Sequence, residues 1–311
     1  MRAAVLHDYG VPAPGDFEEP RAAAGQAVVE VLAAGLNPVD LAIAAGRFYA
    51  GKPPLPSVAG REGVGLLDGA RVYFDAPIVP YGSMAERALI DPASTFPLPD
   101  GLSDGLAVAL GISGLAAWLP LTWHARLAPG EHVLVLAASG VLGQLAVQAA
   151  KLLGAGRVVA AARSQEGLER CLALGADAAV RLEGAPQELA QRFAEAADGR
   201  IDVVLDPLFG EPLLAALHAA SPRARLVQIG AGAAAEVSIP SAPIRGKMLV
   251  LMGHANLAVP REAKAEAYAA MAAHAAAGEL RVEIRQFPLE QVREAWQALA
   301  AGSHRKIMLV P

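Results

Sequence analysis

The chain has 311 residues, which at about 150 residues per domain predicts two domains, and 54% hydrophobic residues is enough to fill two cores. The formal net charge of −5 and the pI of about 5.8 give no overall basic field, which argues against nucleic acid as a partner. The single cysteine, Cys171, excludes an intrachain disulfide framework and a site of clustered thiolates, and it favours a reducing compartment.

The first residues, Met1–Asp8, contain an acid too early and an apolar run too short for a secretory signal. Two uncharged tracts, residues 105–123 and 133–150, approach the roughly 20 apolar residues of a membrane span. Glycines, a proline and two glutamines interrupt them, so we expect buried core segments instead. The sequence therefore predicts a cytoplasmic protein without a membrane partner.

Residues 1–100 are rich in proline and glycine and carry short β-like pieces such as Ala27–Leu32 and Ala70–Phe74. This pattern predicts a small, mainly antiparallel β domain. From about Glu131 the pattern changes to apolar strands that alternate with helical stretches, which is typical of an α/β, doubly wound parallel sheet. The predicted strands are His132–Ala137, Arg157–Ala162, Ala178–Leu182, Asp202–Asp206, Ala224–Gly230 and Lys247–Met252.

The last part of the chain does not continue this alternation. An alanine-rich helix is expected over Arg261–Ala277, a second helix begins near Phe287–Val292, and Lys306–Val310 reads as a final strand. We therefore predict a substrate domain made of residues 1–111 and 255–311, and a dinucleotide-binding domain made of residues 112–254.

The strongest local motif follows the first of the predicted α/β strands. An apolar strand runs into Ala138-x-Gly140-x-x-Gly143 and directly into a helix, which is the context of a dinucleotide-binding turn. Gly140 would let the backbone approach a pyrophosphate, and Gly143 would let the helix pack on the strand. The alternative is a tight turn that needs small residues only. The expected cofactor contacts are Ser139, Gly140, Val141, Leu142 and Gly143.

The end of the second α/β strand indicates which dinucleotide binds. The strand is followed by Arg163 and Ser164, with no acid for a ribose 2′-hydroxyl, so NADPH is favoured over NADH. The alternative is that Arg163 is an ordinary solvated surface residue. Further backbone contacts to the nicotinamide are expected where the last two strands end, at Ile229, Gly230, Ala231, Leu251 and Met252.

Taken together, these segments resemble the medium-chain dehydrogenase/reductase superfamily, in its zinc-free quinone oxidoreductase branch, which includes the ζ-crystallins. The resemblance covers nearly the whole chain. It rests on the order and spacing of residues 1–10, 33–40, 54–65, 82–86, 138–143, 173–177, 202–206, 225–231 and 306–310.

The resemblance implies a GroES-like substrate domain, a Rossmann domain, an active site in the cleft between them, and a homodimer joined through the Rossmann sheets. In zinc-dependent members, residues of the motifs at 33–40 and 60–65 hold the metal. Here the corresponding positions are Asn37 and Arg61, and the four-cysteine zinc lobe is missing. Because a catalytic zinc needs about three protein ligands, we expect no metal.

Without a Lewis acid, hydride transfer to an electron-poor quinone or α,β-unsaturated carbonyl is the least demanding reaction. The resemblance places Asn37 and Tyr49 near that acceptor, as an amide donor and as a phenol that donates or relays a proton. Alternatively, Asn37 only shapes a turn and Tyr49 is a partly buried aromatic. Asp40 is expected to brace Asn37 or Arg61.

Three further expectations concern single residues. Arg61 and Glu62 are expected to form an internal pair, His254 lies where relatives approach the nicotinamide, and Gly167 stands where NADPH-using relatives often carry a lysine. The missing lysine weakens the preference for NADPH.

Two other functions stay open. The first is a dinucleotide-binding redox sensor with little activity. The second is a reductase of acyl thioesters, for which no basic cluster stands out.

Overall fold

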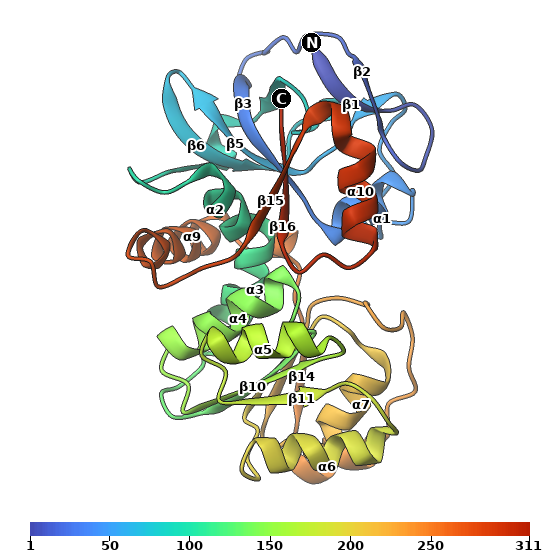
Figure 1. Ribbon diagram of the computed structural model, residues 1–311, viewed down its shortest axis with the longest axis vertical. Coiled ribbons are helices and arrows are strands. Elements are labelled where there is room, and N and C mark those ends of the chain that lie inside the picture. Colours follow the sequence, from blue (N-terminus) through green and yellow to red (C-terminus); the bar gives the residue numbers. More distant parts are fainter. The chain divides into compact units, whose positions relative to one another are not determined.

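The computed structural model describes residues 1–311, which divide into two compact units (Figure 1). Unit 1 comprises Met1–Ser113 and Tyr268–Pro311, and unit 2 comprises Gly114–Ala267. The predicted domain limits, at 111/112 and 254/255, stay a prediction, because a division by contacts does not test independent folding.

Unit 1 contains a seven-stranded sheet with the order β15-β16-β3-β5-β6-β8, in which β7 also pairs with β3, and a three-stranded sheet with the order β2-β1-β4. All pairings are antiparallel except that of β15 with β16. The strands are β1 (Arg2–Leu6), β2 (Ala13–Asp16), β3 (Ala27–Leu36), β4 (Ser57–Val58), β5 (Glu62–Leu67), β6 (Ala70–Asp75), β7 (Arg87–Ile90), β8 (Thr95–Pro97), β15 (Ile284–Pro288) and β16 (Lys306–Val310).

The helices of unit 1 are short and flank these sheets. They are α1 (Pro38–Ala44), η1 (Pro92–Ser94), α2 (Asp104–Ala109), η2 (Leu110–Gly114), η5 (Leu289–Gln291) and α10 (Val292–Ala300). The core joins the two ends of the chain, since Leu36 and Phe74 pack in one cluster with Trp296 and Leu309. The expected mainly β first domain, completed by the end of the chain, matches this arrangement.

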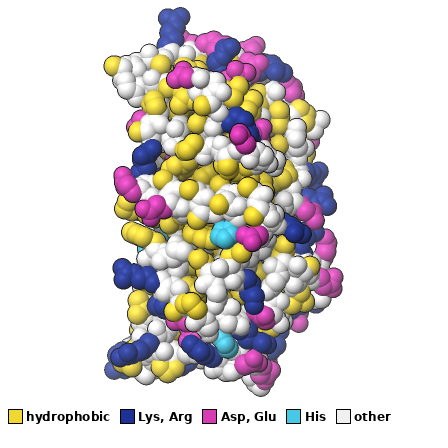
Figure 2. All heavy atoms as spheres, turned by 90° about the vertical axis from the view of Figure 1, so that its left-hand side faces the viewer, with side chains coloured by type: hydrophobic (Ala, Val, Ile, Leu, Met, Phe, Trp, Pro, Cys, Tyr) yellow, Lys and Arg dark blue, Asp and Glu magenta, His cyan; other side chains and the backbone are white.

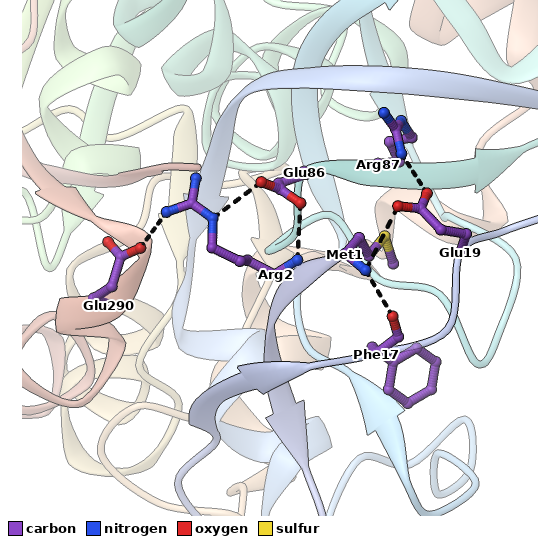
Figure 3. Close-up of polar contacts among 7 residues, drawn as sticks. All are labelled: Met1, Arg2, Phe17, Glu19, Glu86, Arg87 and Glu290. Carbon is purple, nitrogen blue, oxygen red and sulfur yellow. Dashed lines mark hydrogen bonds and ion pairs between the residues drawn. The ribbon is translucent and has the colours of Figure 1, made fainter.

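Ion pairs at the start of the chain reinforce that union (Figure 3). The backbone N–H and guanidinium of Arg2 donate to Glu86, and Arg2 Nη1 lies 2.5 Å from Glu290 Oε1. The Met1 ammonium donates to the Phe17 carbonyl at 2.9 Å. Because Arg2 and Glu290 are 288 positions apart, their contact fixes the tail of the chain against its head.

Unit 2 contains a six-stranded sheet with the order β11-β10-β9-β12-β13-β14, and every pairing is parallel. This confirms the predicted doubly wound sheet. Its strands are β9 (His132–Leu136), β10 (Arg157–Ala162), β11 (Ala178–Arg181), β12 (Val203–Asp206), β13 (Arg225–Gln228) and β14 (Val250–Gly253). Figure 1 shows α4 and α5 on one face of this sheet and α6 and α7 on the other.

The helices of unit 2 are α3 (Leu115–Leu119), η3 (Pro120–His124), α4 (Val141–Leu152), α5 (Gln165–Ala173), α6 (Pro186–Ala196), α7 (Gly210–Ala219), α8 (Ser241–Lys247) and η4 (Asn256–Ala258). Of these, α4 to α8 lie between successive strands in sequence, as expected for right-handed βαβ crossovers, whereas α3 and η3 precede β9 and η4 follows β14. The helix α9 (Arg261–Ala276) contains the limit between the two units.

One strand begins later than predicted. The sequence suggested Lys247–Met252, but Lys247 ends α8, and Met248 adopts a left-handed conformation with φ 54° before β14 starts at Val250. The boundary between α8 and β14 cannot be seen in the sequence, because a hydrophobic run does not distinguish a strand from the end of a helix.

The two uncharged tracts have different structures. Residues 133–150 contain β9, a turn and α4, as predicted. Residues 104–124 form one interrupted helical segment of 21 residues that is long and apolar enough to cross a membrane, and 83% of its most apolar window is buried within the protein. Buried core helices of soluble proteins meet the same criterion. On the face drawn in Figure 2, basic and acidic side chains are interspersed and form no patch of one sign.

Candidate functional site

A cluster of polar side chains lies buried in unit 1, and we call it the Glu62 cluster. It brings together residues from the end of β3, β5, β6, η2 and β16. Its members are Asn37, Glu62, Tyr73, Ser113 and Lys306.

The Glu62 carboxylate accepts four hydrogen bonds. Its Oε1 accepts from Lys306 Nζ at 2.6 Å and from Asn37 Nδ2 at 2.7 Å. Its Oε2 accepts from the Tyr73 hydroxyl at 2.9 Å and from the Ile112 backbone N–H at 2.6 Å. Glu62 is 0% exposed and Lys306 is 1% exposed, so this is an ion pair fully removed from water. Such a pair is tolerated only where further hydrogen bonds satisfy the buried groups, and here Glu62 accepts three bonds besides that from Lys306.

Two glycines make room for this carboxylate. A Cβ at Gly35 would lie 2.4 Å from Glu62 Oε1, and a Cβ at Gly111 would lie 2.3 Å from Glu62 Oε2 and from the Tyr73 hydroxyl. Gly111 also has a non-helical ψ of −117°, which interrupts the helical segment and presents the next N–H to the carboxylate. Neither position can carry a larger residue without moving the cluster.

The start of α1 positions Asn37. Asn37 is the extended residue before the helix, and Pro38 begins it with a φ suited to the first turn. The Asp40 carboxylate accepts the Asn37 backbone N–H at 2.8 Å, which confirms the expectation that Asp40 braces Asn37. The Asn37 side chain instead faces the cluster, where Oδ1 accepts from Lys306 Nζ at 2.6 Å and from the Ser113 hydroxyl at 3.1 Å.

Burial raises the pKa of Asp40, which lies beside the cluster, and of Tyr73, which belongs to it. It raises the pKa of Asp40 to about 7, with the Asn37 backbone hydrogen bond opposing the change and Glu62 adding to it. The second carboxylate oxygen of Asp40, Oδ1, is buried without a hydrogen-bond partner. Burial, reinforced by Glu62, also raises the pKa of Tyr73 well above its usual value, so Tyr73 donates to Glu62 as a neutral phenol.

These residues do not fit a metal ion. No three His, Cys, Asp or Glu side chains form a group that could hold one. Asn37 stands at the position of a metal ligand in the zinc-dependent members that the chain resembles. Its amide oxygen is already bonded to the Lys306 ammonium. A cation at this point would face another cation.

The second predicted acceptor residue, Tyr49, lies outside this cluster. It is 75% exposed, and its ring packs against Phe48 with 4.6 Å between centroids. No hydrogen bond joins it to Asn37. The structure therefore brings Asn37 into a buried network and leaves Tyr49 on the surface of the same unit.

In unit 2, the predicted turn joins β9 to the start of α4 through two glycines. Gly140 precedes α4, whose first N–H groups have no partner within the helix. A Cβ at Gly143 would lie 2.4 Å from Ala138 Cα, so this glycine is required by packing. A Cβ at Gly140 would meet only the Ala137 carbonyl, at 3.6 Å. Packing therefore does not require glycine at 140, which favours a ligand over a turn that merely needs small residues.

The predicted 2′-phosphate residues follow β10, next to β9 in the sheet. Arg163 is exposed. The Ser164 hydroxyl accepts the Gly167 backbone N–H at 3.1 Å and so begins α5, while its own proton stays free to be donated. A Cβ at Gly167 would lie 2.3 Å from Ser139 Cβ. The lysine found there in relatives therefore has no space in this chain while Ser139 keeps its position.

The remaining predicted cofactor contacts lie at the other half of the sheet. Residues 229–231 directly follow β13, whereas Leu251 and Met252 lie within β14. His254 follows β14 and is buried, with Nε2 2.8 Å from Asn256 Oδ1 and with Nδ1 lacking a partner. Burial lowers the pKa of His254 to about 4, so its imidazole is neutral at physiological pH.

One predicted contact is wrong, and several residues were missed. Glu62 pairs with Lys306, not with Arg61, because the two are brought together by sheet pairing although they lie 244 positions apart. Tyr73, Ser113 and Lys306 were not predicted as site residues. A signal for Lys306 was present in the sequence, since it is the one charged residue of the otherwise apolar strand KIMLV.

Comparison with known proteins agrees with this architecture. The family model described as zinc-binding dehydrogenase matches residues 141–273. The crystal structure of a quinone oxidoreductase from Thermus thermophilus, also solved with NADPH, is 32% identical, with a TM-score of 0.82 and 100% of both chains covered. Quinone oxidoreductase of Rattus norvegicus is 30% identical over 253 residues, covering 76% of this chain and 75% of the rat protein.

A different kind of relative is much longer. A subunit of the phenolphthiocerol/phthiocerol polyketide synthase of Mycobacterium tuberculosis is 29% identical over 291 residues, which is 90% of this chain. The chain spans only 13% of the length of that protein.

Proposed function

Because the chain belongs to the medium-chain dehydrogenase/reductase superfamily, among its quinone oxidoreductase-like members, we propose that it transfers hydride from NADPH to a quinone or an α,β-unsaturated carbonyl without zinc. The observation that carries this proposal is the Glu62 cluster. It puts an amide held by an ammonium group where zinc-dependent relatives would place a ligand, and it leaves no set of metal ligands.

NADPH, when bound, supplies the hydride. The residues of the chain would bind and orient both reactants. The N–H groups at the start of α4 would hold the pyrophosphate, with Gly140 leaving space for it. Arg163 is exposed and free to pair with a 2′-phosphate, and the Ser164 hydroxyl can add a donor. These features support NADPH over NADH.

The acceptor gains negative charge on oxygen as hydride arrives. An amide N–H of Asn37 would stabilise that oxygen, since a fixed donor is worth more to the charged product state than to the neutral acceptor. Tyr49, whose phenol is exposed to solvent, would relay the proton that completes a quinol or a saturated ketone. Its ring and that of Phe48, tilted by 49° to each other, offer an apolar surface to the acceptor.

An acyl thioester with an α,β double bond is the second acceptor class. The match to a stretch of a polyketide synthase favours it, and it accepts hydride by the same chemistry as an enone. A redox sensor, which would bind the dinucleotide without turnover, is the remaining alternative.

We also propose a cytoplasmic homodimer. The strand β14 is paired on one side only, and its Val250 and Leu251 are 45% and 39% exposed. An unpaired edge with apolar side chains attracts a second strand. Light scattering should then give twice the 31.9 kDa mass of one chain.

The deciding experiment is an acceptor panel: oxidation of NADPH and of NADH with 9,10-phenanthrenequinone, a simple enone and an unsaturated acyl thioester. We expect turnover with NADPH and a quinone or enone. Tight binding of NADPH without turnover on any acceptor would favour the sensor.

Cofactor preference is tested by Arg163→Ala. Because a charged hydrogen bond contributes about 1.5–3 kcal/mol, we expect this change to weaken NADPH binding tenfold to a hundredfold and to leave NADH binding unchanged. Fluorescence titration of both cofactors measures this. Equal affinities that the substitution leaves unchanged would contradict the phosphate assignment.

A further inference from the structure

Lys306 is the most unusual residue of the Glu62 cluster. It is 1% exposed at the start of the apolar strand β16, and its ammonium bonds to two members of the cluster at once, Glu62 Oε1 and Asn37 Oδ1, both at 2.6 Å. The Asn37 amide nitrogen donates to the same Glu62 oxygen at 2.7 Å. The three side chains thus close a ring of hydrogen bonds.

This ring determines which way the Asn37 amide points. Its oxygen faces a cation and its nitrogen faces an anion, and turning the amide over would put NH₂ against the ammonium and C=O against the carboxylate. Glu62 favours the same orientation, because a carboxylate can only accept from the amide NH₂. Lys306 adds a positive charge bonded to the amide oxygen, so both ends of the amide are held by charged groups. The Ser113 hydroxyl, at 3.1 Å, is a neutral partner of the same oxygen.

An asparagine amide has two N–H groups, and Glu62 engages one of them. A cation bonded to the amide oxygen draws electron density from the nitrogen, because hydrogen bonds in series polarise one another in a low-dielectric interior. The second N–H is thereby both fixed in direction and strengthened as a donor.

We propose that Lys306 is a positioning residue, which orients and polarises the Asn37 amide so that its second N–H meets the oxygen of the acceptor. This inference rests on the proposed function, in which Asn37 stabilises that oxygen. The competing explanation is that Lys306 only balances the charge of Glu62.

A double variant separates these explanations. Lys306→Met alone leaves the Glu62 carboxylate without its counter-charge, so it is expected to lower Tm. Lys306→Met combined with Glu62→Gln removes both charges. The amide introduced at position 62 keeps one oxygen for Asn37 Nδ2, while its NH₂ replaces the oxygen that accepts the Ile112 N–H, so the recovery of Tm is partial. We expect Tm to recover towards that of the wild type, while kcat stays at least about tenfold lower and KM for NADPH stays within about twofold. The matched control is Arg305→Met, which removes the neighbouring exposed charge paired with Glu283 and should change neither Tm nor kcat.

A measurement that needs no activity accompanies the kinetics. The chain has only two asparagines, Asn37 and Asn256, so ¹⁵N-asparagine labelling gives two side-chain amide groups, which Asn256→Asp distinguishes. In the wild type we expect the Asn37 amide protons to exchange slowly with solvent and to resonate away from the free-amide position. In the double variant the shift should be lost, whereas the protection should remain, because Asn37 stays buried.

The outcomes are distinct. A wild-type protein that turns over no acceptor contradicts the proposed function, and the amide spectrum still tests the orientation. A double variant that recovers kcat together with Tm overturns the role of Lys306. So does an Asn37 amide that exchanges freely in the wild type, or one whose resonances are the same in both proteins.

Discussion

The turn between β9 and α4 differs from the Glu62 cluster in the groups that form it. The turn presents backbone N–H groups, and its main requirement is the absence of side chains at Gly140 and Gly143. The cluster consists of side chains that satisfy one another in the interior of unit 1. The first leaves the N–H groups at the start of α4 without partners inside the helix, whereas the side chains of the second already satisfy one another.

This difference predicts that removal of one cluster member is costly. Glu62→Ala would leave the Lys306 ammonium buried without a counter-charge, and we expect a loss of about 3–5 kcal/mol in the free energy of unfolding. Glu283→Ala, which breaks the exposed pair with Arg305, should cost less than about 1 kcal/mol. Urea denaturation measures both. Similar losses in the two variants would show that the cluster is not the rigid part of unit 1.

The cluster should also make stability depend on pH through Asp40, whose charge faces Glu62, Lys306 and Arg61. Its pKa is about 7 in the folded protein and about 3.9 when unfolded, so the folded state holds the proton more tightly. The free energy of unfolding is therefore unaffected by Asp40 below pH 4 and falls as the pH rises towards 7. Above pH 7 it is lower than at pH 4 by up to about 4 kcal/mol.

Asp40→Asn should remove that fall. Between pH 5 and 8 the wild type is expected to lose stability relative to this variant, whereas Asp8→Asn, at an exposed position, should follow the wild type. Parallel curves for all three proteins would mean that Asp40 is ionised in the folded state.

The turn should behave differently, since binding and stability can be separated there. Gly140→Ala places a Cβ at an ordinary contact distance, 3.6 Å, from the Ala137 carbonyl, so we expect an unchanged Tm. The added methyl group would occupy space proposed for the pyrophosphate, so we expect roughly tenfold weaker NADPH binding, about 1.4 kcal/mol. Gly143→Ala places a Cβ 2.4 Å from Ala138 Cα and should lower both Tm and affinity. An unchanged affinity of Gly140→Ala for NADPH would show that the turn has a structural role only.

The same contrast explains what could be predicted from the sequence. The strand, turn and helix around Gly140 are contiguous, so local spacing reveals them. Glu62 and Lys306 are 244 positions apart and meet only because β16 pairs with β3 and β3 with β5. Sequence proximity instead suggested Arg61 as the partner of Glu62. Tyr73 gave no local sign of polar function, because it reaches Glu62 through the pairing of β5 with β6. Ser113 gave none either, because it follows the kink at Gly111.

The buried ammonium of Lys306 also bears on how this chain could change its chemistry. A divalent ion at position 37 would meet the fixed positive charge of the Lys306 ammonium, which is bonded to the Asn37 amide oxygen. Removing Lys306 first would leave Glu62 without its counter-charge, at the energetic cost described above. A metal site here therefore requires simultaneous changes at the end of β3, on β5 and on β16, because Asn37, Glu62 and Lys306 are held in one network.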